Sequence, residues 1–177
     1  KGKEQFETTL ELVYDERAGI SLESRKAQGK MAKELFDMTQ DLAYLVYQVD
    51  SYLDYAEKIK ASDPKSSKSM TAFINELNEL KERLVITTGD NYVDTAEPEL
   101  REKISQLYGV VIANFDRPSV IQEENKNTLN EKLKESQNKF TNTISKHEYL
   151  PIYTNNLDER LKRHNSGYEK YTSKGIP

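Results

Sequence analysis

The period of the hydrophobic pattern changes near Ser21. Before it, apolar side chains and threonine recur at every second position, which is typical of a β-strand. Those positions are Phe6, Thr8, Leu10, Leu12 and Tyr14. After it, apolar residues recur every three or four positions, which is typical of amphipathic helices. The sequence therefore predicts an all-α fold preceded by one short N-terminal β-strand.

The first predicted helix, residues 22–60, carries the longest apolar stripe, and Ser21 is its expected N-cap. Steps of four and three residues separate the stripe positions. They are Met31, Leu35, Met38, Leu42, Leu45, Val49, Tyr52, Ala56 and Ile59. At 1.5 Å per residue this helix would be on the order of 60 Å long. We therefore expect it to extend beyond its partners, with a bend or projection around Gly29.

Two shorter helices are predicted at residues 69–86 and 96–115. The first follows a polar connection that contains Pro64, and its stripe is Met70, Phe73, Leu77, Leu80 and Leu84. The second has Thr95 as its expected N-cap and Pro98 in its first turn, where a missing N–H costs little. Its stripe is Leu100, Ile104, Leu107, Val111 and Phe115.

A fourth helix is predicted at residues 120–149, before Pro151. Ser119 and Gln122 form a predicted capping box, in which each side chain accepts a hydrogen bond from the backbone N–H of the other. The inner face of this helix is the most polar of the four. It consists of Val120, Leu129, Leu133, Phe140 and Ile144, with Ser136 and His147 alongside them.

Short polar connections between four such helices predict an up-down four-helix bundle over residues 19–150. Residues 1–18 are then the N-terminal strand and a junction, and residues 151–177 are a polar tail with one short helix near 155–163. The composition agrees with a bundle, because 36% of the 177 residues are hydrophobic and 32% are charged.

Charge and hydropathy narrow the classes of partner. The net charge of -4 is spread along the chain without a basic block, so we expect neither nucleic-acid binding nor a membrane-surface patch. No apolar run approaches the roughly 20 residues that a membrane helix needs, so we expect no membrane insertion. The absence of cysteine excludes disulfides and thiolate chemistry.

Motifs for catalysis or metal binding are missing. A ferritin-like dimetal centre needs Glu-x-x-His pairs, but the residues three positions before His147 and His164 are Ile144 and Leu161. There is no nucleophile elbow, Walker loop or dinucleotide glycine fingerprint. We expect no metal, no cofactor and no enzymatic activity in this region. Asp37 and Asp41 share a helical face, which we interpret as a solvated pair.

Tyrosine is the one residue type that indicates a binding surface. The chain has 11 Tyr and no Trp, and Tyr44, Tyr47 and Tyr55 lie off the centre of the first helix's stripe. Aromatic rings with polar tips suit contacts with sugars and proteins. Two interpretations stay open: these rings pack along the edge of the bundle interface, or they form an exposed surface for a glycan or a protein partner.

Several short segments resemble the C-terminal region of large bacterial proteins with sortilin-like or Asp-box (BNR) repeat propellers, which are often described as glycosyl hydrolases. In that family a β-rich domain follows the propeller, and its last strand runs through Asp-Pro-Arg into a helical bundle. The segment "LELVYDERAGIS" is similar to this junction, with Asp15 and Arg17 in the motif positions and Glu16 in place of the proline. Further resemblance lies in "KAQGKMAKELFDMTQDLAYLVYQVDSYLD", "NFDRPSVIQEENKNTLNEKL", "NNLDERL" and the final "GIP".

The resemblance implies a non-catalytic accessory bundle of an extracytoplasmic protein, because any catalytic residues would belong to the propeller. Residues 4–14 would be the last strand of the preceding β-domain, and Asp15 and Arg17 would fix the angle at which it leaves, unless they form only a solvated pair. Neighbouring β-domains of the same polypeptide are the expected partners. The alternative is a free-standing module that binds a glycan or a protein through Tyr44, Tyr47 and Tyr55.

Overall fold

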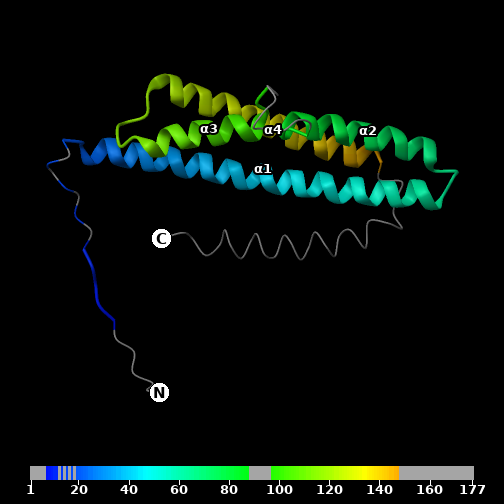
Figure 1. Cartoon of the computed structure of the whole chain (residues 1–177), viewed down its shortest axis with the longest axis horizontal. Helices are drawn as coiled ribbons and strands as arrows, with labels where there is room; N and C mark the ends of the chain where they lie inside the picture. Colours follow the sequence, from blue (N-terminus) through cyan, green and yellow to red (C-terminus); the bar gives the residue numbers. More distant parts are fainter. Residues whose placement is uncertain are drawn as a thin grey trace, which may run out of the picture.

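Four helices make up the described part of the chain, which comprises residues 7–11, 13, 15, 17, 19–87 and 97–147 of the computed structural model. The helices are α1 (Leu22–Ser62), α2 (Ser67–Leu84), α3 (Leu100–Ala113) and α4 (Val120–Lys146) (Figure 1). No strand occurs among these residues. The predicted all-α class is therefore confirmed.

The predicted N-terminal strand is not confirmed. Residues 7–11 and 13 are exposed and have no regular secondary structure, while Phe6, Leu12 and Tyr14 lie outside the described residues. A strand needs a neighbour to accept and donate its hydrogen bonds, and the described residues contain no second strand. Gly19, at φ 68°, adopts the left-handed conformation that favours glycine and redirects the chain just before α1.

The helices α2 and α3 lie end to end along α1 (Figure 1). Lys81 of α2 forms an ion pair with Asp50 of α1 at 2.7 Å, and Gln28 of α1 donates a hydrogen bond to the carbonyl of Val111 in α3 at 3.1 Å. As the chain advances through α2 and α3, its partners therefore lie progressively nearer the start of α1. Both short helices run antiparallel to α1 and parallel to one another.

The fourth helix returns parallel to α1 and spans both short helices. Near its start Lys126 pairs with Glu34 of α1, and near its end the Thr143 hydroxyl donates to Glu76 of α2 at 3.3 Å. The bundle therefore has three helices in cross-section, so the predicted up-down alternation is corrected at α3. Length explains the difference: α1 has 41 residues, or about 61 Å, while α2 and α3 have 18 and 14.

This tandem arrangement corrects the predicted overhang of the first helix. Because α3 and α4 cover its N-terminal half, Met31, Leu35 and Met38 are buried there. Gly29 lies within an uninterrupted helix and causes no break. The stripe predicted for α1 is buried throughout, except that Tyr52 is half-buried.

The predicted stripes of α2, α3 and α4 also face the core, with two exceptions. All five stripe positions of α2 are buried, and Ile74 joins them. The central positions of α3 and α4 are buried too, namely Leu100, Ile104, Val111, Leu129, Leu133 and Phe140. Phe115 and Val120, predicted as core residues, are instead 60% and 72% exposed. Both of these residues lie where α3 leads into α4.

The helix caps agree with the sequence at α1 and α4. Ser21 Oγ accepts a hydrogen bond from the backbone N–H of Ser24 at 3.1 Å. In the predicted capping box, the Ser119 N–H donates to Gln122 Oε1 at 2.8 Å and the Gln122 N–H donates to Ser119 Oγ at 3.2 Å. The described residues end at His147, the C-cap of α4, so Pro151 and the tail prediction lie outside them.

The start of α3 is later than predicted. Its N-cap is Glu99, which forms a capping box with Glu102, and Pro98 therefore precedes the cap instead of lying in the first turn. Thr95, the predicted N-cap, lies outside the described residues. Proline disfavours helical backbone at the residue before it, so Pro98 excludes Glu97 from a helix.

Candidate functional site

The exposed large hydrophobic residues of the described chain gather at one end of the bundle, where α1 begins, α3 ends and α4 begins (Figure 1). We call six of them the apolar end: Leu22, Val110, Ile112, Phe115, Val120 and Ile121. The other two, Leu10 and Val13, belong to the N-terminal segment that leads away from this same end and are more than four-fifths exposed. Elsewhere in the described helices, no large hydrophobic side chain is exposed.

Contacts between α1 and the α3–α4 connection hold the apolar end together. Arg117 Nη1 lies 3.3 Å from Glu23 Oε1, in the first turn of α1. The Arg25 guanidinium lies 5.9 Å from the centre of the Phe115 ring, within the range of a cation–π interaction. These contacts fix Phe115 against the start of α1 while leaving most of its ring in solvent.

The connection itself has defined hydrogen bonds. Asn114 Nδ2 donates to the carbonyl of Val110 at 2.9 Å and so satisfies one of the free carbonyls at the end of α3. Two residues after Asp116, Pro118 leads into the Ser119 cap of α4. A hollow of about 210 Å³ lies between this connection and Gln28 of α1. The connection is therefore tied to the end of α3 by Asn114 and to the start of α4 by the Ser119 cap.

The sequence contains a signal for the apolar end that lies outside the predicted stripes. Val110, Val111 and Ile112 are consecutive, and successive helical residues point about 100° apart. Only Val111 faces the core, where it is 2% exposed, so its two neighbours must face outward. The adjacent pair Val120 and Ile121 at the start of α4 presents the same conflict. Runs of adjacent apolar residues at helix ends indicate a second apolar face.

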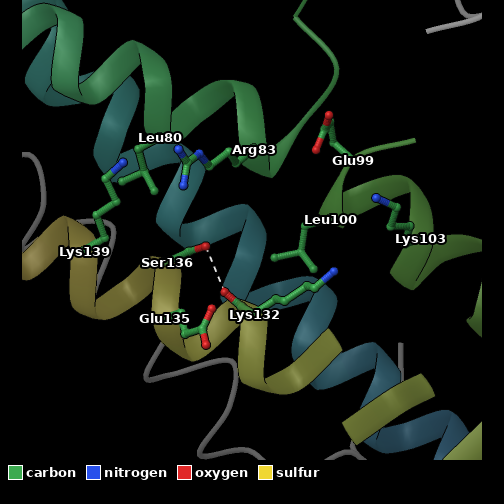
Figure 2. Close-up of a pocket in the computed structure, with 9 residues that line it drawn as sticks. All are labelled: Leu80, Arg83, Glu99, Leu100, Lys103, Lys132, Glu135, Ser136 and Lys139. Carbon is green, nitrogen blue, oxygen red and sulfur yellow. Dashed lines mark hydrogen bonds between the residues drawn. The ribbon is translucent and has the colours of Figure 1, made fainter. Parts of the chain in front are cut away.

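A pocket lies where α2 ends and α3 begins, opposite the middle of α4 (Figure 2). We call it the junction pocket. Its volume is about 310 Å³, and two buried leucines, Leu80 and Leu100, contribute the apolar part of its lining. The remaining lining residues are polar or charged: Arg83, Glu99, Lys103, Lys132, Glu135, Ser136 and Lys139.

Cations outnumber carboxylates around the junction pocket. It has four, Arg83, Lys103, Lys132 and Lys139, against Glu99 and Glu135. The Glu99 carboxylate accepts a hydrogen bond from the backbone at the start of α3, so it is already engaged in capping that helix. Ser136 donates its hydroxyl hydrogen to the carbonyl of Lys132 at 2.9 Å (Figure 2). Within the described residues none of the four cations forms an ion pair.

The three tyrosines singled out from the sequence lie in neither place. Tyr44, Tyr47 and Tyr55 are all half-buried on α1. Tyr55 packs against the hydrophobic core. The rings therefore lie along the side of the bundle, away from the six residues of the apolar end and from the junction pocket lining.

Asp15 and Arg17 contact each other in the exposed segment before α1. Arg17 Nε and Nη2 each lie 2.9 Å from a different oxygen of Asp15, and the Arg17 N–H donates to Asp15 Oδ1 at 3.0 Å. The side-chain hydrogen bond from Arg17, followed by its backbone N–H, lowers the pKa of the Asp15 carboxyl. The pair thus closes a local turn, and its part in a domain junction stays a prediction.

The residues considered for metal binding and acid–base chemistry do not come together in one site. Lys33 pairs with Asp37 at 2.6 Å, and the His147 ring lies 4.6 Å from the Phe73 ring. Among the described residues no group of three or more His, Cys, Asp or Glu side chains could hold a metal ion. His164 lies outside them. None of the described helices is long and apolar enough to cross a membrane.

Comparison with protein-family models, curated proteins and solved structures finds no match to this chain.

Proposed function

We propose that this chain is a non-catalytic structural bundle that packs through its apolar end against a neighbouring β-domain of the same polypeptide. The setting we propose is an extracytoplasmic protein of the sortilin-like, Asp-box propeller class that the sequence resembles. In this role the bundle orients its neighbour. The N-terminal segment would complete the edge of the neighbour's sheet, since its backbone has no strand to pair with among the described residues.

One observation carries the proposal: all exposed large hydrophobic residues of the described helices and of the α3–α4 connection lie at the end from which the N-terminal segment departs. Large apolar side chains that gather in the solvent at one end of a domain are typical of an interaction site. A domain placed before residue 1 would be tethered next to this surface. The turn closed by Asp15 and Arg17 and the left-handed backbone at Gly19 would set the direction of the tether.

The energetics favour an intramolecular contact. Burying a large apolar side chain completely contributes about 1.5–3 kcal/mol. The six side chains of the apolar end are about half exposed, so covering them contributes about 1 kcal/mol each. A short tether gives an effective concentration in the millimolar range, where about 4 kcal/mol of contact energy suffices for docking. The apolar end therefore suits a tethered domain better than a freely diffusing partner.

Small-angle X-ray scattering of the protein expressed from its full reading frame tests the proposal. The variant Phe115→Ser, Val120→Ser, Ile121→Ser removes about 3 kcal/mol of the apolar contact. We expect its radius of gyration to increase because the bundle detaches from its neighbour.

A matched control, Glu131→Ser, Lys134→Ser, Asn142→Ser, changes three exposed residues of α4 outside the apolar end. We expect this control to scatter like the unmodified protein. Identical scattering from the apolar-end variant, or a reading frame that encodes no β-domain before residue 1, would show that the proposal is wrong.

A further inference from the structure

We propose that the junction pocket binds a small polyanion carrying phosphate or sulfate groups. Arg83, Lys103, Lys132 and Lys139 would hold its charged groups, while an uncharged polar remainder would extend along the neighbouring groove between α3 and α4. This proposal is independent of the docking role of the apolar end, because none of the residues involved belongs to that surface except Val110, which lies at the far limit of the groove.

The pocket exists because of the tandem arrangement of α2 and α3. A single continuous helix would pack along the whole of α4, but here α2 ends at Leu84 and α3 begins at Leu100. The gap between them is lined by residues of three helices, with Leu80 and Leu100 as its apolar part (Figure 2). Its volume of about 310 Å³ is at the lower limit of the range typical of small-molecule sites.

Charge identifies the kind of ligand. The chain as a whole has a net charge of -4, yet this pocket collects four cations. Lysines at other helix–helix contacts are neutralised, as in Lys81 with Asp50 and Lys126 with Glu34. Like charges in one pocket repel each other, and an anion among them would relieve that repulsion.

The arrangement of the cations favours a ligand with more than one anionic group. Lys132 and Lys139 are two helical turns apart on α4, or about 10 Å along the axis. Figure 2 shows the Arg83 guanidinium on the same side of the pocket as Lys139, and Lys103 on the same side as Lys132. An arginine fork matches the oxygens of phosphate and sulfate, whereas lysine supplies compact positive charges. Two anionic groups would therefore satisfy the two sides.

The surroundings set the direction of the rest of the ligand. Toward α2 and the end of α4, the adjoining groove contains the carboxylates Glu76, Glu79 and Glu135 together with Lys139 and Lys146. An uncharged group placed there would have to displace water from these charged side chains. Toward α3 and the start of α4, the adjoining groove of about 510 Å³ shares Lys103 and Lys132 with the pocket. Its other lining residues carry no charge: Gln106, Leu107, Val110, Gln122, Asn125, Thr128 and Leu129. An uncharged polar group would therefore extend in the second direction, where it displaces water from fewer charged side chains.

Titration of the full chain with inorganic pyrophosphate at low ionic strength, followed by calorimetry and by backbone amide shifts, tests this inference. Parallel titrations with sulfate separate the two anion types. We expect saturable binding with shifts confined to the pocket residues. Each exposed charge pair contributes up to about 1 kcal/mol, so Lys132→Gln should weaken binding about fivefold and Arg83→Gln, Lys132→Gln about 25-fold.

A matched control removes the same charge elsewhere: Lys68→Gln, Lys134→Gln, on α2 and α4 outside the pocket. It should change the affinity less than twofold. Glu135→Gln should strengthen binding severalfold, because it removes a carboxylate from the pocket. The inference would be overturned if neither pyrophosphate nor sulfate bound saturably. It would also be overturned if the control variant lost as much affinity as Arg83→Gln, Lys132→Gln.

Discussion

The two ends of the bundle differ in how far their large hydrophobic side chains are buried. At the end where α1 leads into α2 and α4 stops, the Tyr52 ring forms edge-to-face contacts with the rings of Phe73 and Phe140, with centroids 6.3 and 5.7 Å apart, and His147 packs against Phe73. We call this the closed end. At the apolar end, Phe115, Val120 and Ile121 are each at least 60% exposed.

The contrast indicates that the apolar side chains of the apolar end are exposed although the helices around them are in place. The closed end buries the rings of Phe73 and Phe140 because three helices, α1, α2 and α4, overlap there. The apolar end also has three helices, α1, α3 and α4, held by Arg117 with Glu23 and by the Ser119 capping box, yet it leaves additional apolar residues outside the core. A surplus of apolar residues on a structured end supports the docking surface that we propose.

The largest expected effect is a loss in the free energy of unfolding, and it should differ between one phenylalanine from each end. Phe140, which is 7% exposed, belongs to the closed end, and Phe140→Ala should lower the free energy of unfolding by about 3–5 kcal/mol. Phe115→Ala should lower it by no more than about 1 kcal/mol, mainly through loss of the contact with Arg25. Chemical denaturation followed by circular dichroism measures both. Equal losses would mean that Phe115 belongs to the core and that the two ends do not differ.

The next effect tests whether the apolar end is ordered. Ser119→Ala removes the side-chain acceptor of the α4 capping box and should cost about 1 kcal/mol. The control Ser145→Ala, at an exposed position within α4, should be neutral or slightly stabilising because alanine is the better helix former. Thermal unfolding of both variants gives the comparison. A neutral Ser119→Ala would indicate that the start of α4 is frayed.

A smaller effect concerns the pH dependence of stability at the closed end, in the connection between α1 and α2. The Ser66 hydroxyl donates to Asp63 Oδ2 and the Lys65 N–H donates to Asp63 Oδ1, and these bonds lower the pKa of the Asp63 carboxyl, with the bond from Ser66 the largest cause. A carboxyl with a lowered pKa stabilises the fold above its unfolded pKa of about 3.9. This stabilisation is lost as the pH falls below that value toward the folded pKa.

Asp63→Asn should therefore lower the thermal midpoint at pH 7 slightly, and its difference from the unmodified chain should shrink below pH 4. The exposed substitution Asp54→Asn on α1 provides the control. A difference that grows as the pH falls would contradict the role assigned to Asp63.

The smallest expected effect is that of the N-terminal segment. Its described residues are exposed and make no regular structure, so deletion of residues 1–14 should leave the thermal midpoint nearly unchanged. Differential scanning calorimetry of the shortened chain measures this. A large decrease would show that the segment belongs to the bundle and would remove the argument for pairing it with a neighbouring sheet.

The core and the caps could be predicted from the sequence because they follow from local rules. Steps of three and four residues place Leu35, Leu42 and Val49 on one face of a helix whatever its partners are. The Ser119 and Gln122 spacing determines a cap within a single turn. Such features need no knowledge of the tertiary arrangement.

The tandem arrangement and both candidate sites could not be predicted in this way. The stripe of the first helix indicates its length, but the stripes of α2 and α3 do not show that both helices pack end to end along it. Arg83, Lys103, Lys132 and Lys139 come from three helices and meet only after that arrangement is fixed. Phe115 continues the spacing of the α3 stripe but lies beyond the end of that helix at Ala113. Val120 lies nine residues before Leu129, which places it on the opposite face of α4 from the buried stripe.

Cysteine labelling tests the docking of the apolar end most directly, since the chain itself contains no cysteine. Ile121→Cys reports on the apolar end and Asn75→Cys, at an exposed position of α2, provides the control. In the isolated bundle both thiols should react with a maleimide at similar rates. In the protein expressed from the full reading frame, we expect Ile121→Cys to react at least about tenfold more slowly while Asn75→Cys is unchanged. Equal rates at both positions would contradict the account.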